Sequence, residues 1–588
     1  MRLKEAQLLP AAPHRNNFMA KLTALSQPKV IYIVLIALLI TVGCFRIIST
    51  YSIFSQTWDE PAHIAAGMQW LDHGLYTFEQ MHPPLARVMV ALGLYLNGVR
   101  SRDGIEDNTS FKEGNAILQS GGQYERNLTL SRLGILPFFI IASITVASWA
   151  YNMGGMGASL LATLLFTTLP PILANAGIAT LDMASAASVP AAFFSVTLFL
   201  KKPTLRRSIL LGIATGLAIL IKFTALYFLT LGYGLIIVAY SLQKLLKRID
   251  EGKYLSDKFQ WIKASAVVIL LCGLTIWAGY RFSVYPKVSA ERRPHEALDL
   301  IVGTEGVMHD ISYFLLENTT VPAPEFFLGV YTTYTQNEDG RDTYFLGEIW
   351  PYGRWYYYPI VFAIKTPLPF LLLASIGLFY TCREIFRKNP VSFHLSIPPI
   401  AVAAIFLISM GSNMNLGIRQ ILSVYPLFAI VGGYGASSLL NSFKKGGFLG
   451  PALVAVFLAW QLIASFGAHP DYLAYFNELA GDRPEDIVVD SNLDWGQDLK
   501  RLAQTLEKRG IEEISISYYG SDDIDLDLFN LPAWKSLPPY QKVRGWVAIS
   551  ISSLKTGTGR APFDKLAWLQ DYYPVERIGK TILLYYIP

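Results

Sequence analysis

The chain has 588 residues, of which 52% are hydrophobic and only 16% are charged, whereas about 25% of a typical soluble domain is charged. This composition argues against an ordinary soluble enzyme and indicates a protein that lies largely in lipid. The formal net charge of +5 does not indicate nucleic-acid binding, because the basic residues fall in short clusters between apolar runs rather than along one face.

Long apolar runs follow one another along most of the chain. A spanning helix needs roughly 20 mostly apolar residues, because lipid offers no partner for exposed backbone groups. We therefore predict a polytopic α-helical membrane protein with about eleven transmembrane helices, near residues 30–49, 133–150, 156–174, 183–200, 207–221, 225–243, 262–281, 358–381, 395–411, 418–440 and 448–467.

The basic residues predict how these helices are oriented. A basic tail, residues 1–29, precedes the first run, and we place it in the cytoplasm. Every second connection is then basic, as the positive-inside rule requires: Lys201, Lys202, Arg206 and Arg207; residues 244–263; Arg383, Arg387 and Lys388; Lys444 and Lys445. The remaining connections, including the long segments 50–132 and 282–357, are expected outside, and an odd number of spans also leaves residues 468–588 outside.

The sequence changes character after residue 467. Residues 487–489, 514–519, 547–552 and 581–587 have the pattern of strands, and residues 497–508 have that of a helix. This alternation predicts a small α/β domain. The expected organisation is a cytoplasmic tail (1–29), a transmembrane domain with large outer loops (30–467) and an extracytoplasmic α/β domain (468–588).

Two adjacent carboxylates, Asp59 and Glu60, follow the first predicted helix in Trp58-Asp59-Glu60-Pro61. Such a pair at a membrane surface could supply a general base and a ligand for a substrate or a divalent metal ion. The simpler interpretation is a solvated loop with a proline-directed helix start, and on these residues alone it is favoured.

Further charged residues fall at predicted outer helix ends. Asp182 lies in the short second outer loop, where it could cap a helix or act on a substrate. Lys222, Lys365 and Arg419 could each merely reach the interface, but three cations on one side favour a phosphate-bearing substrate. His82, before two prolines, could bind metal or phosphate, or be structural.

These residues lie in motifs that resemble the GT-C class of lipid-carrier-dependent glycosyltransferases, which includes protein O-mannosyltransferases and the lipid A aminoarabinose transferase. The motifs are Trp58-Asp59-Glu60, His82-Pro83-Pro84-Leu85, Thr180-Leu181-Asp182, Lys365-Thr366-Pro367 and Gly417-Ile418-Arg419-Gln420. The tail segments 469–478 and 490–499 are similar to those of a bacterial branch described as phospholipid-carrier-dependent glycosyltransferases.

The resemblance implies a polyprenyl-phosphate sugar as donor, a hexosyl or pentosyl unit as the transferred group, and an active site on the periplasmic face of the inner membrane. It implies that Asp59 is the base, that Glu60 supports it or binds a metal, and that Asp182 positions the acceptor or the sugar. Arg419 and Lys365, with His82 and Lys222, would bind the donor phosphate. Which sugar is transferred, whether the acceptor is a lipid, glycan or protein, and whether a metal is required remain open.

Charged residues in a helical bundle also mark transport paths, so a transporter or flippase of a lipid-linked or anionic solute is the main alternative. The sequence shows no inverted repeat. Most candidate residues also fall at outer helix ends, not at the middle of the bilayer. A scaffold that merely presents the C-terminal domain would need only one spanning helix.

Overall fold

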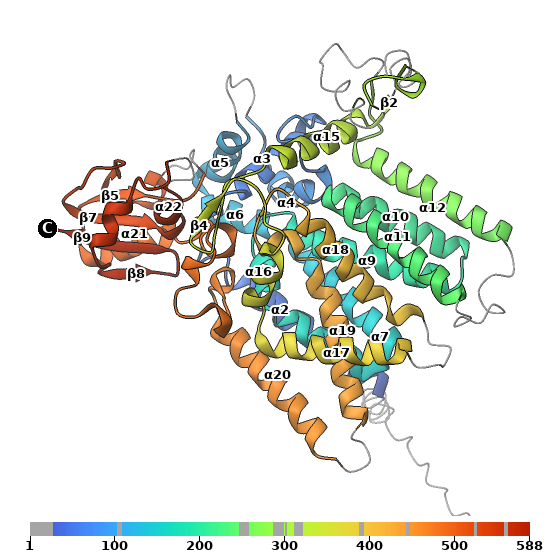
Figure 1. Cartoon of the computed structure of the whole chain (residues 1–588). Coiled ribbons are helices and arrows are strands. Elements are labelled where there is room, and N and C mark those ends of the chain that lie inside the picture. The colour runs from blue at the N-terminus through green and yellow to red at the C-terminus, as the bar shows by residue number, and fades with distance from the viewer. Residues whose placement is uncertain are drawn as a thin grey trace, which may run out of the picture.

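The computed structural model describes residues 28–102, 109–245, 258–285, 299, 303–310, 321–386, 393–442, 447–521, 526–557 and 562–588. These residues form a large bundle of helices and a smaller part with a β-sheet at the C-terminal end (Figure 1). Most of the predicted cytoplasmic tail and several basic residues of the predicted inner connections lie outside the described residues: 246–257, Arg387, Lys388, Lys444 and Lys445.

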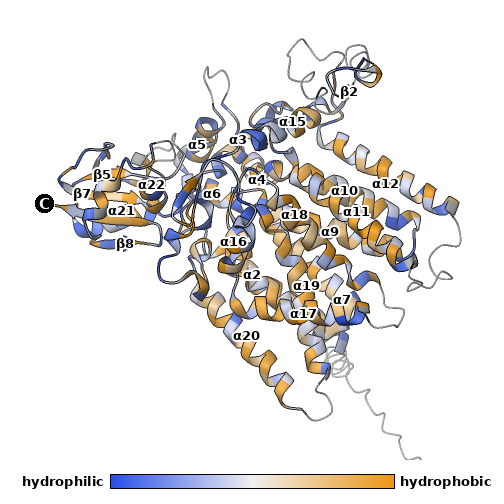
Figure 2. Ribbon diagram, viewed as in Figure 1, coloured by the Kyte–Doolittle hydropathy of each residue, from blue (hydrophilic) through white to orange (hydrophobic). Residues whose placement is uncertain are grey.

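Each predicted apolar run overlaps a helix of the bundle. The bundle helices are α2 (Pro28–Ile48), α7 (Leu136–Thr167), α9 (Asp182–Lys201), α10 (Leu205–Ile221), α11 (Thr224–Leu245), α12 (Lys258–Gly279), α17 (Leu368–Phe386), α18 (Ile397–Met410), α19 (Val424–Ser442) and α20 (Leu449–Gly467). In the described part of the chain, 8 helices are long and apolar enough to cross a membrane. The bundle is predominantly hydrophobic (Figure 2), which confirms a polytopic membrane protein.

Helix α7 contains two of the predicted runs and folds back on itself. Gly155 interrupts the helix with φ 74° and ψ −162°. The Ser159 hydroxyl donates to the Ala147 carbonyl at 2.8 Å, although residues twelve apart would be about 18 Å apart along a straight helix. The chain therefore reverses at Gly155, and the two arms of α7 are separate passes.

The first and the central connecting segments contain several helices and two short strand pairs in the part of the chain that the structure describes. They contain α3 (Glu60–His73), α4 (Pro84–Leu96), α5 (Ser110–Gln119), α6 (Tyr124–Leu133), α15 (Pro324–Asp339) and α16 (Tyr357–Lys365), the strand pair β1 (Val284–Tyr285) and β2 (Val321–Pro322), and the hairpin β3 (Thr343–Phe345) and β4 (Glu348–Trp350). Together with α8 (Pro170–Ala176) they gather at one end of the bundle (Figure 1). The C-terminal part of the chain lies at the same end.

Short 3-10 helices shape the connections. They are η1 (Ser120–Gly122), η3 (Phe393–Leu395), η4 (Ile418–Ile421), η5 (Tyr472–Ala474), η6 (Glu478–Ala480), η7 (Pro484–Asp486), η8 (Asp490–Asn492), η9 (Leu526–Phe529) and η11 (Ala567–Asp571). Two of them, η4 and η8, are in contact with each other. This contact joins the connection before α19 to the C-terminal part.

The C-terminal part contains a five-stranded sheet with strand order β6-β5-β7-β9-β8. Its elements are α21 (Leu499–Arg509), β5 (Glu513–Ser517), β6 (Ala533–Ser536), β7 (Gly545–Ser550), α22 (Ile551–Thr556), β8 (Glu576–Ile578) and β9 (Ile582–Ile587). Strand β5 pairs in parallel with β6 and β7, whereas β9 is antiparallel to β7 and β8. The expected small α/β domain is confirmed.

One strand prediction is wrong. Residues 487–489 form no strand, and Val488 makes only an isolated bridge to Phe345. The reason is that this apolar run packs against the helical bundle, whose core includes Val488 and Tyr472. Residues 468–498 therefore lie along the bundle before the sheet begins.

Candidate functional site

A cavity of about 460 Å³ lies at the end of the bundle that carries the connecting helices. Its walls come from the start of α3, the turn before α4, the junction of α10 and α11, helix α15, and the connection from α18 to η4. Its charged and polar lining includes Asp59, His63, Glu79, His82, Lys222, Asn337, Arg341, Arg419 and Gln420, and its aromatic lining includes Trp58, Phe111, Phe223, Tyr227, Phe228 and Tyr334.

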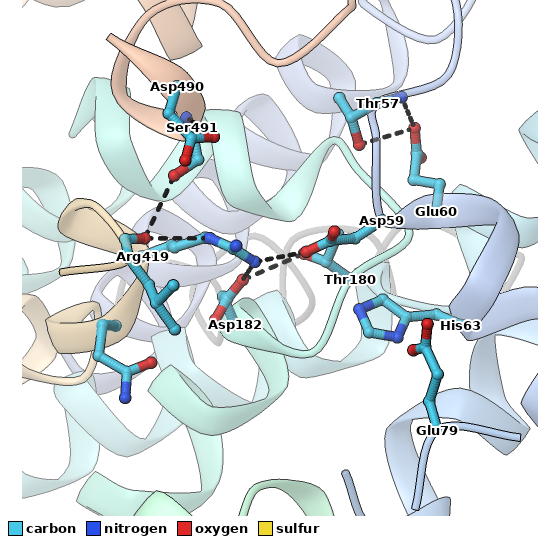
Figure 3. Close-up of polar contacts among 12 residues, drawn as sticks. Thr57, Asp59, Glu60, His63, Glu79, Thr180, Asp182, Arg419, Asp490 and Ser491 are labelled. Carbon is cyan, nitrogen blue, oxygen red and sulfur yellow. Dashed lines mark hydrogen bonds and ion pairs between the residues drawn. The ribbon is translucent and has the colours of Figure 1, made fainter. Parts of the chain in front are cut away.

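Asp59 and Arg419 form an ion pair on the cavity wall, although they are 360 positions apart in the sequence. One guanidinium nitrogen of Arg419 lies 2.7 Å from Oδ2 of Asp59 (Figure 3). The Asp59 side chain is still 26% exposed, and it makes no capping hydrogen bond to α3. The helix-cap interpretation therefore has no support, and the carboxylate remains accessible from the cavity.

Asp182 lies behind this pair and is buried. Its Oδ1 accepts a hydrogen bond from Lys222 Nζ at 2.7 Å, and its Oδ2 is 3.8 Å from Arg419. Lys222 also donates to Gln420 Oε1 at 2.9 Å. Asp182 is the first residue of α9 and not its cap. Two carboxylates and two cations thus form one charge-balanced cluster.

The cluster lies at helix ends on one side of the bundle. Asp182 begins α9, Lys222 follows α10, and Arg419 lies in η4 before α19. A transport path would be expected to place charges along the length of the bundle. The arrangement therefore favours a site at one face of the membrane over a pathway through it.

The resemblance implies that Glu60 supports Asp59 or binds a metal. The structure places Glu60 outside the cavity with its oxygens occupied, which corrects the metal role. Both Glu60 oxygens are paired with Arg132 at 2.9 Å. They also accept the backbone N–H groups of Thr57 and Ala179 at 2.7 Å. With its acceptor sites occupied and its side chain buried, Glu60 holds the 57–60 turn against the loop before α9.

Lys365 is also outside the cavity, so its predicted contact with the donor phosphate is corrected. Its ammonium donates to the backbone carbonyls of Leu473 at 2.8 Å and Asn492 at 2.6 Å. It also lies 4.1 Å from the centre of the Phe476 ring. Lys365 fastens the C-terminal segment to α16.

His82 does line the cavity, beside His63, with 5.5 Å between the ring centres. Burial, followed by the charge of Arg87, holds the pKa of both imidazoles well below its usual range. Arg87 donates to Nδ1 of His63 at 3.2 Å. A guanidinium can only donate, so the neutral His63 carries its proton on Nε2. Both histidines are therefore neutral hydrogen-bonding groups and not phosphate-binding cations.

Several cavity residues were not identified from the sequence. Arg341 follows α15 and lies 4.0 Å from Asp490 of the C-terminal part. Asp490 is the largest influence on the pKa of Arg341 and raises it. Glu79 pairs with Arg87 at 3.0 Å. Only the proximity of Arg341 to an aromatic-rich outer segment could have suggested it, because its partners come from distant parts of the chain.

A bound metal ion would need a cluster of side-chain ligands. No group of three or more His, Cys, Asp or Glu residues within the described ranges could hold a metal ion. Of the carboxylates that could have been ligands, Glu60 has its oxygens occupied by Arg132 and backbone donors. The described residues thus give no coordination set for the divalent ion considered above.

The family of dolichyl-phosphate-mannose-protein mannosyltransferases matches residues 36–284, a segment that contains Asp59, His82, Asp182 and Lys222. No curated protein sequence matches the chain.

Solved structures show limited similarity. ArnT from Cupriavidus metallidurans bound to undecaprenyl phosphate has 12% identity and a TM-score of 0.46, with 93% of this chain and 97% of that chain covered. The oligosaccharyltransferase AglB from Archaeoglobus fulgidus, in complex with an inhibitory peptide and a dolichol-phosphate, has 12% identity and a TM-score of 0.44, with 92% of this chain and 72% of that chain covered. The predicted resemblance to protein O-mannosyltransferases is confirmed for residues 36–284 by the family match.

Proposed function

We propose that this protein is a glycosyltransferase that moves a hexosyl or pentosyl group from a polyprenyl-phosphate donor to an acceptor hydroxyl at the extracytoplasmic face. The observation that carries the proposal is the Asp59–Arg419 pair, which presents a carboxylate and a cation together on the wall of a 460 Å³ cavity. The family that matches residues 36–284 is named for a lipid-phosphate sugar donor.

The cavity suits both parts of such a donor. Tyr227 and Phe228 from α11 and Ile408 from α18 form an apolar wall on spanning helices, where a polyprenyl chain could enter from the lipid. Neutral hydrogen-bonding groups such as His63 and Asn337 lie among the charged residues of the remaining wall and suit sugar hydroxyls. An open, mostly apolar cavity with a few polar groups is the usual form of a small-molecule site.

In the reaction, a carboxylate oxygen of Asp59 takes the proton of the acceptor hydroxyl, and the acceptor oxygen forms a bond to the anomeric carbon. The bond between that carbon and the phosphate oxygen breaks, and its electron pair leaves with the polyprenyl phosphate. Arg419, supported by Lys222, stabilises the charge that develops on the departing phosphate. Asp182 holds both cations at the cavity and so acts as a positioning residue.

The donor phosphate and the Asp59 carboxylate compete for the guanidinium of Arg419. Arg419 has several N–H donors to share. A donor phosphate can therefore take over part of the guanidinium while the rest stays with Asp59.

The absolute orientation is part of the proposal. Arg341, which lines the cavity, lies 4.0 Å from Asp490, so the cavity shares one end of the bundle with residues 468–588. The positive-inside rule assigns that end to the extracytoplasmic side. Reporter fusions after Gly467 and before Pro28 test it. A periplasm-active reporter is expected to be active only after Gly467, and a cytoplasm-active reporter that is active there would reject the assignment.

The activity itself is tested with purified protein in lipid nanodiscs and a panel of polyprenyl-phosphate hexoses and pentoses. Sugar transfer, measured as release of polyprenyl phosphate in the presence of candidate lipid, glycan and peptide acceptors, is expected for wild type and lost in Asp59→Asn. The same assay with and without a chelator tests for a divalent metal requirement. If donor crosses the bilayer of reconstituted vesicles unchanged and no sugar is transferred, the transporter alternative is correct.

A further inference from the structure

The segment Asp490–Gln497 of the C-terminal part joins the two loops that carry the base and the cation. We propose that this bridging segment positions Asp59 and Arg419 for the proposed glycosyl transfer, with Trp495 as its central positioning residue. The inference rests on the proposed function only for its kinetic consequences. The positioning itself is a property of the protein without substrate.

The bridging segment holds the loop of Arg419. The side-chain oxygen of Asn492 accepts the Ile418 N–H at 2.9 Å, and the Ser491 hydroxyl donates to the Leu416 carbonyl at 3.2 Å. Between them, Gly417 adopts φ 78°, and a Cβ there would lie 2.6 Å from Ser491 Oγ. The close approach of the bridging segment to the loop of Arg419 therefore depends on glycine at this position.

The same segment holds the loop of Asp59. The Trp58 N–H donates to the Trp495 carbonyl at 3.0 Å, and the Ser55 N–H donates to the Gln497 carbonyl at 3.1 Å. The Ser55 hydroxyl donates to the Gly496 carbonyl at 3.1 Å. These bonds fix the chain immediately before Asp59.

Trp495 contacts both loops at once. Its carbonyl accepts from Trp58, next to Asp59, and its ring lies 4.3 Å from the guanidinium carbon of Arg419. The ring is buried and does not line the cavity. The ring therefore packs against one face of the guanidinium and leaves the other side of Arg419 to face the cavity. The contact is favourable because a planar cation lies over a desolvated indole.

The bridging segment is itself held by two helices, α22 and α16. Asp494 accepts the Ser552 N–H at 2.8 Å, which ties the segment to the start of α22 beside the sheet. Asn492 accepts Lys365 through its carbonyl and donates to the Tyr357 hydroxyl at 3.0 Å, which ties it to α16. A rigid support of this kind is what the geometry of a reacting pair requires, because a displacement of about 1 Å can cost about 100-fold in rate.

The test compares full-length wild type, Trp495→Leu, Trp495→Phe and the matched control Trp546→Leu. Trp546 lies in β7 of the same C-terminal part, where its ring packs 5.2 Å from that of Tyr586, and it does not line the cavity. The first readout is deuterium uptake of the peptides covering residues 55–59 and 416–420 in the substrate-free protein. The second is kcat and KM for a polyprenyl-phosphate sugar.

Trp495→Leu is expected to raise deuterium uptake in residues 416–420 and to lower kcat by about 100-fold, with a smaller change in KM. Trp495→Phe should show deuterium uptake and kcat close to those of wild type. Trp546→Leu should leave both near wild type. The inference is overturned if uptake in 416–420 is unchanged in Trp495→Leu, if the control raises it equally, or if uptake rises while kcat does not fall. If wild type transfers no sugar, the proposed function fails, and the uptake data alone decide the positioning role.

Discussion

Replacing Asp59 with Asn removes the proposed base while changing its shape very little. The side chain loses its charge and can no longer accept the acceptor proton, but it can still accept a hydrogen bond from Arg419, which is 2.7 Å away. Loss of a general base typically lowers the rate by about 100-fold to 10,000-fold. At about 1.4 kcal/mol per tenfold, this corresponds to about 3–6 kcal/mol of transition-state stabilisation.

The cost to folding is expected to be much smaller. Asp59 is 26% exposed, and pairs at such exposure contribute no more than about 1 kcal/mol. Arg419 also retains Asp182 at 3.8 Å, so it is not left without a counter-charge. Asp182→Asn is different, because it leaves the buried Lys222 without its carboxylate, and breaking a buried pair costs about 3–5 kcal/mol of stability.

The assay measures single-turnover sugar transfer, donor affinity and thermal unfolding for wild type, Asp59→Asn and Asp182→Asn. Asp471→Asn is the matched control, because Asp471 also pairs with an arginine, at 2.6 Å and with 21% exposure, outside the 460 Å³ cavity. Asp59→Asn should lose transfer with only a small change in melting temperature. Asp182→Asn should lose transfer and also unfold at a clearly lower temperature. Asp471→Asn should keep transfer.

Transfer by Asp59→Asn within threefold of wild type would refute the assignment of the base. Equal losses of transfer in Asp59→Asn and Asp471→Asn would show that the effect is a general consequence of neutralising an acid at this face. Loss of folded protein in Asp59→Asn would contradict the estimate of its ion-pair contribution.

Four further outcomes are expected. Arg419→Ala should weaken binding of polyprenyl phosphate at least tenfold in a fluorescence titration, and Arg419→Lys should bind with intermediate affinity, because a single ammonium cannot bind bidentately. Equal affinities of wild type and Arg419→Ala would exclude Arg419 from the donor site. Glu60→Gln should lower the melting temperature by leaving Arg132 buried without a charged partner, and an unaltered unfolding curve would contradict the structural role. Burial raises the pKa of Asp494 to about 7, so the folded state holds a proton that the unfolded state releases near pH 4, and the free energy of unfolding should fall as the pH rises from about 4 to 7. Asp494→Asn should flatten this dependence in thermal unfolding at pH 5 and 8, and an equal decline in wild type and variant would refute it. Lys365→Met should reduce stability and leave donor affinity unchanged, whereas a loss of affinity in the same titration would return Lys365 to the phosphate site.

The membrane architecture was accessible from the sequence because its cause is local. A run of apolar residues is helical in lipid whatever its neighbours are, so the runs near 133–150 and 156–174 were separable even though a single helix, α7, contains both. Short edge strands were not accessible in this way. Strand β6 is exposed throughout, and it therefore lacks the alternation of polar and apolar residues that marks a half-buried strand.

The site was only partly accessible, because side-chain direction depends on partners far away in the sequence. Asp59 and Glu60 are adjacent, yet successive residues of a helix point about 100° apart, and here one faces the cavity and the other faces Arg132. Lys365 is at a helix end as expected, but its partners are residues 473 and 492. The charge of His82 could not be predicted either, because it depends on burial beside Arg87.

The hydrogen bond from Ser55 to Gly496 spans 441 positions of the chain, and this has a consequence for biosynthesis. At about 5–20 residues per second, roughly 20–90 seconds pass between synthesis of the first partner and synthesis of the second. During that interval the Asp59 loop exists without the surface on which it finally rests. A ribosome that stalls after α20, or a chain that is cut there, therefore leaves the described helices of the bundle in place and the Asp59 loop without its contacts to residues 495–497.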